Sequence, residues 1–214
     1  MNILALEAAD FALTMALLKD DVVVSTFEHP QAYDVESILL PKAKEMVESH
    51  GLTFHDLDAL VTTAGPGSFT GIRIAMAACQ GLAMAIPCPA LAFNVFEWVK
   101  DWARETYEIP RDYKILVALE SKRAELFLQL EGEEPLNCAP SDLVGTFDPS
   151  SIVLVGSGAY AFGDAPGFQR VIKAMPKAAD LAVYGAQQFQ TKGPEYFPCT
   201  PFYLRPADVH GSKK

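Results

Sequence analysis

The stretch Leu57–Arg73, LDALVTTAGPGSFTGIR, indicates the fold of this 214-residue chain. A short apolar run, typical of a buried strand, leads into a glycine-rich loop, and a run of small residues that predicts a helix, Thr70–Ala85, follows. Many α/β proteins hold phosphate with a strand, a glycine loop and a helix start, because backbone N–H groups and the helix N-terminus favour an anion. The alternative is a tight turn that lets the helix pack closely.

The glycine spacing fits neither standard phosphate-binding fingerprint. Gly65, Gly67 and Gly71 follow G-x-G-x-x-x-G, which is one residue longer than the dinucleotide motif. No lysine stands where a Walker loop needs one, and Pro66 has no N–H to donate. The loop alone therefore leaves both interpretations open.

Three side chains at the helix start have assignable roles. Ser68 is the expected N-cap, with Thr70 as the rival cap. Arg73 lies in the first turn, where the helix dipole disfavours a cation. A cation placed against that preference faces a carboxylate, an anion or solvent.

Composition and charge narrow the class of protein. Half of the residues are apolar, which suffices for one large domain or two lobes. The net charge of −10 disfavours binding of nucleic acid by the chain alone, so any contact with RNA is expected through a partner. The four cysteines form no CxxC pair, which favours reduced thiols and a cytoplasmic protein. The N-terminus has no signal-peptide pattern, and prolines interrupt the uncharged stretch 74–96, so no membrane segment is expected.

Hydrophobic periodicity predicts strand hairpins followed by helices, twice over. Strands are predicted at 3–6, 12–19, 22–28, 58–63, 87–93, 114–119, 125–130 and 152–155, and helices at 35–50, 70–85, 95–105 and 179–190. The segment 142–147 is ambiguous, and the proline-rich tail from 194 is expected to be loosely structured, apart from residues 202–205. The pattern indicates an α/β chain of two related lobes, residues 1–105 and 106–214. Trp98 and Trp102 share a helix face and are expected to serve the core.

The sequence lacks the residue patterns that a zinc peptidase or a serine hydrolase requires. The histidines show no HExxH spacing, so neither a zinc peptidase nor another metal site is expected. They are His29, His50, His55 and His210. Ser68 does not lie in a G-x-S-x-G elbow, which disfavours a serine hydrolase. No catalytic residue is assigned.

The helix after the glycine loop is predicted to form a partner interface. It is apolar nearly all round, which indicates cover on both sides, and small residues allow close approach of another helix. The candidate interface residues are Gly71, Ala75, Met76, Ala78, Gln80 and Leu82. The alternative is that this face packs within its own lobe.

Four segments, in order, resemble the TsaB family (YeaZ type, glycoprotease-like). They are ILALEAADFALTMAL, LDALVTTAGPGSFTGIRIAMAACQGLA, ILVALESKRAELFLQL and PFYLRP. The resemblance implies an actin-like (ASKHA) fold of two lobes, each with a mixed sheet and helices. It also implies a non-catalytic subunit, without a cofactor, that binds and activates TsaD. With TsaE, this complex transfers threonylcarbamoyl to adenosine 37 of ANN-decoding tRNAs. The helices Val35–His50 and Thr70–Ala85 would pair with TsaD, or with a second copy as a homodimer.

The chain departs from the family pattern at two turns. Its first strand and loop read ILALEAA where members usually have ILAIDTS, so Glu7, Ala8 and Ala9 replace an Asp and two hydroxyls. The second hairpin has Glu120-Ser121-Lys122, with Arg123 one place on, instead of Asp-Ala-Arg. These changes argue against intrinsic ATP binding. They disfavour the rival hypothesis of an ATP-dependent kinase or carbamoyl-type transferase, and a metallopeptidase, the second rival, lacks its ligands.

Overall fold

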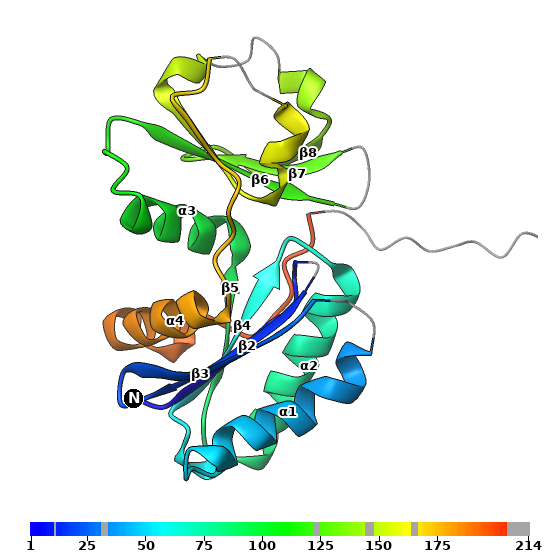
Figure 1. Ribbon diagram of the computed structural model, residues 1–214, viewed down its shortest axis with the longest axis vertical. Coiled ribbons are helices and arrows are strands. Elements are labelled where there is room, and N and C mark those ends of the chain that lie inside the picture. The colour runs from blue at the N-terminus through cyan, green and yellow to red at the C-terminus, as the bar shows by residue number, and fades with distance from the viewer. Residues whose placement is uncertain (11, 31–33, 122–124, 144–147, 164–166, 205–214) are drawn as a thin grey trace, which may run out of the picture.

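The computed structural model describes residues 1–10, 12–30, 34–121, 125–143, 148–163 and 167–204. Two sheets lie one above the other along the long axis of the molecule, with a helix between them (Figure 1). The first sheet contains β1 (Ile3–Glu7), β2 (Leu13–Lys19), β3 (Val22–His29), β4 (Ala59–Gly65) and β5 (Ala90–Asn94). The second contains β6 (Lys114–Glu120), β7 (Leu126–Leu130), β8 (Leu136–Cys138), β9 (Ile152–Val155) and β10 (Arg170–Ile172).

The two sheets repeat one topology. The first has the strand order β3-β2-β1-β4-β5 and the second β8-β7-β6-β9-β10. In the first sheet, β2 pairs antiparallel with β1 and β3, and β4 pairs parallel with β1 and β5. In the second sheet, β7 pairs antiparallel with β6 and β8, and β9 pairs parallel with β6 and β10. This repetition confirms the prediction of an α/β chain with two related mixed sheets. The three-residue strands β8 and β10 were not predicted, because so short a segment carries no periodicity.

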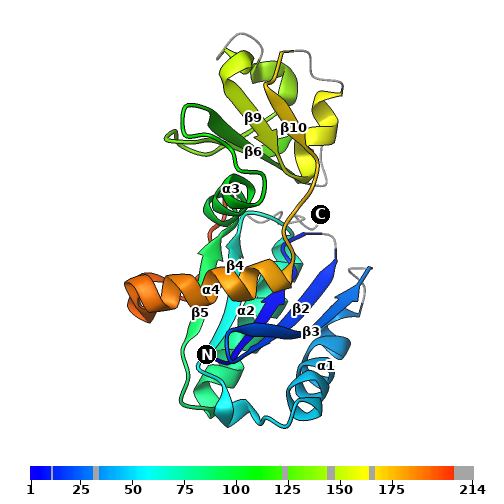
Figure 2. The same cartoon turned by 60° about the vertical axis from the view of Figure 1, so that its left-hand side comes forward.

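Helices cover both faces of the first sheet, as Figures 1 and 2 show. On one face, α1 (Val35–Ser49) and α2 (Phe69–Ala85) pack against Leu4 and Leu6 of β1. On the other, α4 (Ala178–Lys192) packs against Ile3 and Ala5. Strands β1 and β4 are therefore buried along their whole length, whereas the edge strand β3 alternates between exposed and half-buried residues.

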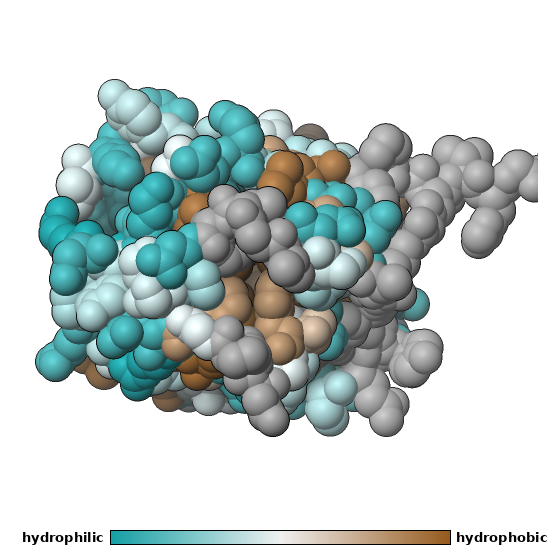
Figure 3. Space-filling view, turned by 90° about the horizontal axis from the view of Figure 1, so that it is seen from above, coloured by the Kyte–Doolittle hydropathy of each residue, from teal (hydrophilic) through white to brown (hydrophobic). Residues whose placement is uncertain are grey.

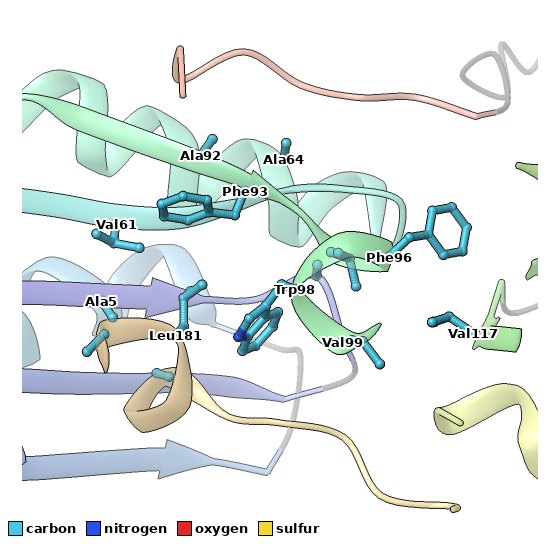
Figure 4. Close-up of a cluster of buried hydrophobic side chains, with 14 of the residues drawn as sticks. Ala5, Val61, Ala64, Ala92, Phe93, Phe96, Trp98, Val99, Val117 and Leu181 are labelled. Carbon is cyan, nitrogen blue, oxygen red and sulfur yellow. The ribbon is translucent and has the colours of Figure 1, made fainter. Parts of the chain in front are cut away.

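A continuous core joins the two lobes through α3 (Val95–Thr106). Phe96 and Val99 of this helix belong to one cluster with Val117 of the second sheet and Phe93 and Leu181 of the first lobe (Figure 4). The opposite face of the second sheet is covered by the short 3₁₀ helix Ser157–Phe162 and loops. Seen from that end, the described surface is mostly hydrophilic, with a small apolar area near its middle (Figure 3).

The C-terminal part of the chain returns to the first lobe. Helix α4 packs on the first sheet, and the following segment pairs Pro198 with Leu91 of β5. The Phe202 N–H donates to the Ala64 carbonyl at 2.8 Å. The prediction of a loose tail is therefore wrong over residues 194–200, where a short 3₁₀ helix and backbone hydrogen bonds hold the segment, whereas the exception predicted at 202–205 agrees with the Phe202 hydrogen bond. The first sheet ends with β5 and the second begins with β6, which agrees with a boundary near residue 105. Helix α4, however, belongs to residues 106–214 and packs on the first sheet, so the division into 1–105 and 106–214 remains a proposal.

Candidate functional site

The glycine loop connects β4 to α2. The Ser68 hydroxyl accepts a hydrogen bond from the Gly71 N–H at 3.3 Å, which confirms Ser68 as the N-cap. Thr70 is an exposed residue of the first turn and does not cap the helix. The Gly71 N–H, a donor that a bound anion would need, is therefore already hydrogen-bonded to Ser68.

The glycines of the loop are explained by the first loop, which follows β1. The Ser68 N–H donates to the Ala9 carbonyl at 2.6 Å. A Cβ atom at Gly67 would lie 2.4 Å from that same oxygen, and one at Gly71 would lie 1.8 Å from the Ala8 oxygen. Backbone therefore packs on backbone here, which favours the tight-turn interpretation over a phosphate cradle.

Glu7 is the buried carboxylic acid of this region. It is 4% exposed, and Oε1 accepts hydrogen bonds from the Ala9 N–H at 2.7 Å and from the Thr63 hydroxyl at 3.4 Å. Burial raises the pKa of Glu7 from 4.5 to about 7, with a further increase from the nearby Asp10. The side chain therefore holds the first loop against β4 and binds a proton near neutral pH.

The cleft between the lobes is narrow at this point. Its cavity of about 20 Å³ is lined by residues of both lobes, including Glu7, Asp10, Gly67, Trp98 and Glu120. Pockets that bind small ligands measure about 300–1,000 Å³, so the cleft in this conformation has space for about one water molecule. Three carboxyl groups line it, which disfavours the phosphates of a nucleotide. The predicted departures at Lys122 and Arg123 lie outside the described residues.

The structure corrects the predicted inner side of the α2 interface. Gly71, Ala75 and Met76 are buried within the chain, Ala75 completely, so another protein cannot reach them on this surface. Gly71 meets the first loop, Ala75 packs toward α1, and Met76 packs on the other core cluster. The apolar character of α2 on these sides is due to internal packing.

The remaining predicted interface residues differ in exposure. Ala78 and Leu82 are half-buried and pack against the cluster that contains α1. Gln80 is exposed, and its side-chain amide donates to the Cys199 carbonyl at 2.7 Å, so it holds the tail in place.

A different stripe of α2 is open to solvent. Ala77, Gly81 and Met84 are exposed, Met84 at 90%, and a Cβ atom at Gly81 would meet nothing within 4 Å. These three residues, called the α2 stripe below, are spaced so that they share one helix face. None of these three residues was among the interface residues predicted from the sequence. Because alanines occur on both sides of α2, the sequence does not indicate which side of the helix faces the core.

Within the described part of the chain, Arg73 contacts aromatic side chains and forms no ion pair with a carboxylate. Its guanidinium lies 3.7 Å from the Phe69 ring centroid, and Nε donates to the Tyr203 hydroxyl at 3.0 Å. These contacts stabilise a cation in the first helical turn by cation–π attraction and tie the tail to α2.

Other site classes find no support in the described part of the chain. There, no three His, Cys, Asp or Glu side chains gather as a metal site would require. None of the described helices is long and apolar enough to span a membrane. The four cysteines are free thiols.

The duplicated mixed sheets and the central helix define the class of protein: the chain has the actin-like ATPase (ASKHA) fold. The solved structure "YeaZ from Pseudomonas aeruginosa" shares it with a TM-score of 0.76, at 21% sequence identity over 95% of this chain and 99% of that one.

Sequence comparisons narrow the class. A family model, "TsaD: tRNA N6-adenosine threonylcarbamoyltransferase", matches residues 32–133. The "tRNA threonylcarbamoyladenosine biosynthesis protein TsaB" of Escherichia coli K12 is 29% identical over 59% of this chain, and that of Haemophilus influenzae is 24% identical over 76%. The alignments span 53% and 74% of those two relatives. The chain is thus similar in sequence to proteins named TsaB and shares the fold of YeaZ.

Proposed function

We propose that this chain acts in tRNA threonylcarbamoyladenosine biosynthesis as a non-catalytic subunit that binds and activates TsaD. The relatives named for this pathway support the general role. TsaE and tRNA would join through the complex, because a net charge of −10 disfavours tRNA binding by the chain alone.

The closed cleft between the lobes supports a role without catalysis. Actin-like enzymes bind nucleotide between their lobes, whereas here about 20 Å³ remain and carboxyl groups line the space. Glu7 is engaged with the first loop, and Ala8 and Ala9 have no hydroxyl to offer. We therefore propose that the site has no bound cofactor and no turnover of its own.

The α2 stripe is the observation that carries the proposed interface. Small residues at 77 and 81 let a partner helix approach closely, and an almost fully exposed methionine provides an apolar anchor beside them. Leu40 on the neighbouring α1 is exposed as well, so both helices offer apolar surface. We propose that TsaD occupies this surface and that a second copy of the chain occupies it when TsaD is absent.

Reconstitution tests the proposal. TsaD, TsaE, ATP, the threonylcarbamoyl adenylate and an ANN-decoding tRNA are combined with and without this chain, and modified adenosine is measured by mass spectrometry. We expect product formation to depend on the chain together with TsaD. Equal product without the chain, or product from the chain without TsaD, contradicts the proposed role.

A further inference from the structure

The α2 stripe continues toward the start of the helix to a charged residue, Arg73. Arg73 is exposed and precedes the stripe by one helical turn, so its side chain lies on the same face of α2. It is the one charged residue in this 17-residue helix, all of which the structure describes. A partner helix that lies along the stripe therefore meets a single positive charge at the end of a surface that is otherwise uncharged.

Two aromatic side chains hold the Arg73 guanidinium in one orientation. The guanidinium carbon lies 3.7 Å from the Phe69 ring centroid and 5.6 Å from the Tyr203 ring centroid. Nε donates to the Tyr203 hydroxyl at 3.0 Å, and the two rings contact each other with their centroids 4.8 Å apart. An arginine held in this way loses less conformational entropy on binding than a flexible surface arginine does.

The C-terminal segment brings Tyr203 to this position. Figure 1 shows its last described residues, in red, near the start of α2. The Cys199 carbonyl accepts a hydrogen bond from the Gln80 side chain at 2.7 Å, and the Phe202 N–H donates to the Ala64 carbonyl at 2.8 Å. The backbone that precedes Tyr203 is therefore fixed against α2 and β4, so the ring is placed over the start of the helix.

The two terminal amino groups of Arg73, Nη1 and Nη2, have no hydrogen-bond acceptor within the described part of the chain. The helix dipole also disfavours a cation in the first turn, so the position of this charge does not serve the stability of α2. A partner that covered the guanidinium without offering an acceptor would lose affinity. The planar fork of the guanidinium matches a carboxylate, which accepts two parallel hydrogen bonds from it.

We infer that the Arg73 guanidinium forms an ion pair with a carboxylate of TsaD and that Tyr203 is the positioning residue that orients it. This inference rests on the proposed function and adds the charged contact that specifies the partner's orientation. Because the charge stands at one end of an uncharged stripe, one direction of the partner helix brings its carboxylate to Arg73. The reversed direction leaves the guanidinium covered and unpaired, which costs affinity.

The affinity for TsaD of wild type, Arg73→Gln and Arg73→Lys tests the ion pair by isothermal titration calorimetry, with circular dichroism on the same samples. Arg73→Gln should stay folded and bind about 10- to 150-fold more weakly, since a hydrogen bond to a charged group contributes this ratio. Arg73→Lys keeps the charge and loses the fork, so its affinity should lie between the other two. Arg111→Gln, at an exposed arginine in the loop before β6, is the matched control and should bind like wild type.

A double-mutant cycle tests the positioning role of Tyr203. Tyr203→Phe removes the hydroxyl that accepts from Arg73 and should weaken TsaD binding about two- to fivefold. In the Arg73→Gln background the same change should have no effect, because the hydroxyl acts through the guanidinium. Equal effects of Tyr203→Phe in both backgrounds would overturn the positioning role.

Two further outcomes separate this inference from the proposed function. A folded Arg73→Gln chain that binds TsaD within about twofold of wild type, or that loses no more affinity than Arg111→Gln, overturns the ion pair and leaves the proposed function standing. A wild-type chain that does not bind TsaD overturns the proposed function and the ion pair with it.

Discussion

Replacement of Glu7 by glutamine should change how the stability of the protein depends on pH. In the folded chain, burial raises the pKa of this carboxyl to about 7, whereas 4.5 is its ordinary value. The folded state therefore binds a proton more tightly than the unfolded state. Stability from this group is fully present below pH 4.5 and is lost as the pH rises through about 7.

The size of the effect follows from the two pKa values. A difference of about 2.5 units corresponds to roughly 3 kcal/mol, because one unit is about 1.4 kcal/mol. Between pH 5 and pH 8, the free energy of unfolding should lose about 2.5 kcal/mol of this contribution from Glu7. The glutamine side chain of the variant keeps an oxygen that accepts from the Ala9 N–H and cannot ionise. The free energy of unfolding of Glu7→Gln should therefore gain about 2.5 kcal/mol relative to wild type over this range.

Urea unfolding at several pH values between 5 and 8 measures this difference. Glu134→Gln removes one exposed negative charge far from the cleft and serves as the matched control. Curves for Glu7→Gln and wild type that stay parallel within about 0.5 kcal/mol, the size of an ordinary surface effect, would refute the assignment of a neutral buried carboxyl.

Three further predictions concern the glycine loop, nucleotide and RNA. Gly71→Ala should destabilise the chain by about 1–3 kcal/mol or more, because its Cβ would lie 1.8 Å from the Ala8 oxygen. Gly81→Ala has open space around it and should stabilise the chain by about 0.5–1 kcal/mol. Thermal melting of both variants checks this difference, and similar melting temperatures contradict it. The purified chain should release no phosphate from ATP above a mock preparation, because the cleft has no space for a nucleotide; sustained release that Glu7→Ala abolishes contradicts this. The chain alone should bind tRNA weakly at physiological salt, since its net charge is −10; gel shifts with and without TsaD measure it, and tight, salt-sensitive binding by the chain alone argues against it.

Local sequence signals predicted most of the fold. The runs at β1 and β4 are apolar because both faces of those strands are covered, and the two apolar runs at β6 and β7, which flank a short polar segment, predicted a hairpin. The expectation of two related lobes followed from the repeated order of elements. The return of α4 to the first sheet was not predictable, because nothing in residues 178–192 specifies which lobe its apolar face meets.

The candidate site was predictable only in part. Ser68 was found because N-caps have a local signature, whereas the partner of Arg73 is Tyr203, 130 residues further along the chain. The inward side of α2 depends on where Ala8 approaches Gly71, and no periodicity distinguishes Ala75 from Ala77. Contacts between distant segments decide all of these features.

The α2 stripe is the part of the proposed function that a single substitution tests most directly. Ala77 is exposed, so Ala77→Glu should leave the chain folded while placing an unpaired charge in the proposed seam. Leaving a charge unpaired in an interface costs about 2–5 kcal/mol, which is roughly 30- to 5,000-fold in affinity. Ala161→Glu, at an exposed alanine of the second lobe, is the matched control.

The decisive measurement is the affinity of wild type, Ala77→Glu and Ala161→Glu for TsaD by isothermal titration calorimetry, with circular dichroism on the same samples. The proposed interface predicts that Ala77→Glu stays folded and loses at least about 30-fold in affinity, while Ala161→Glu binds like wild type. A folded Ala77→Glu chain that binds TsaD as tightly as the wild type would contradict the proposal that α2 is the surface through which this chain acts.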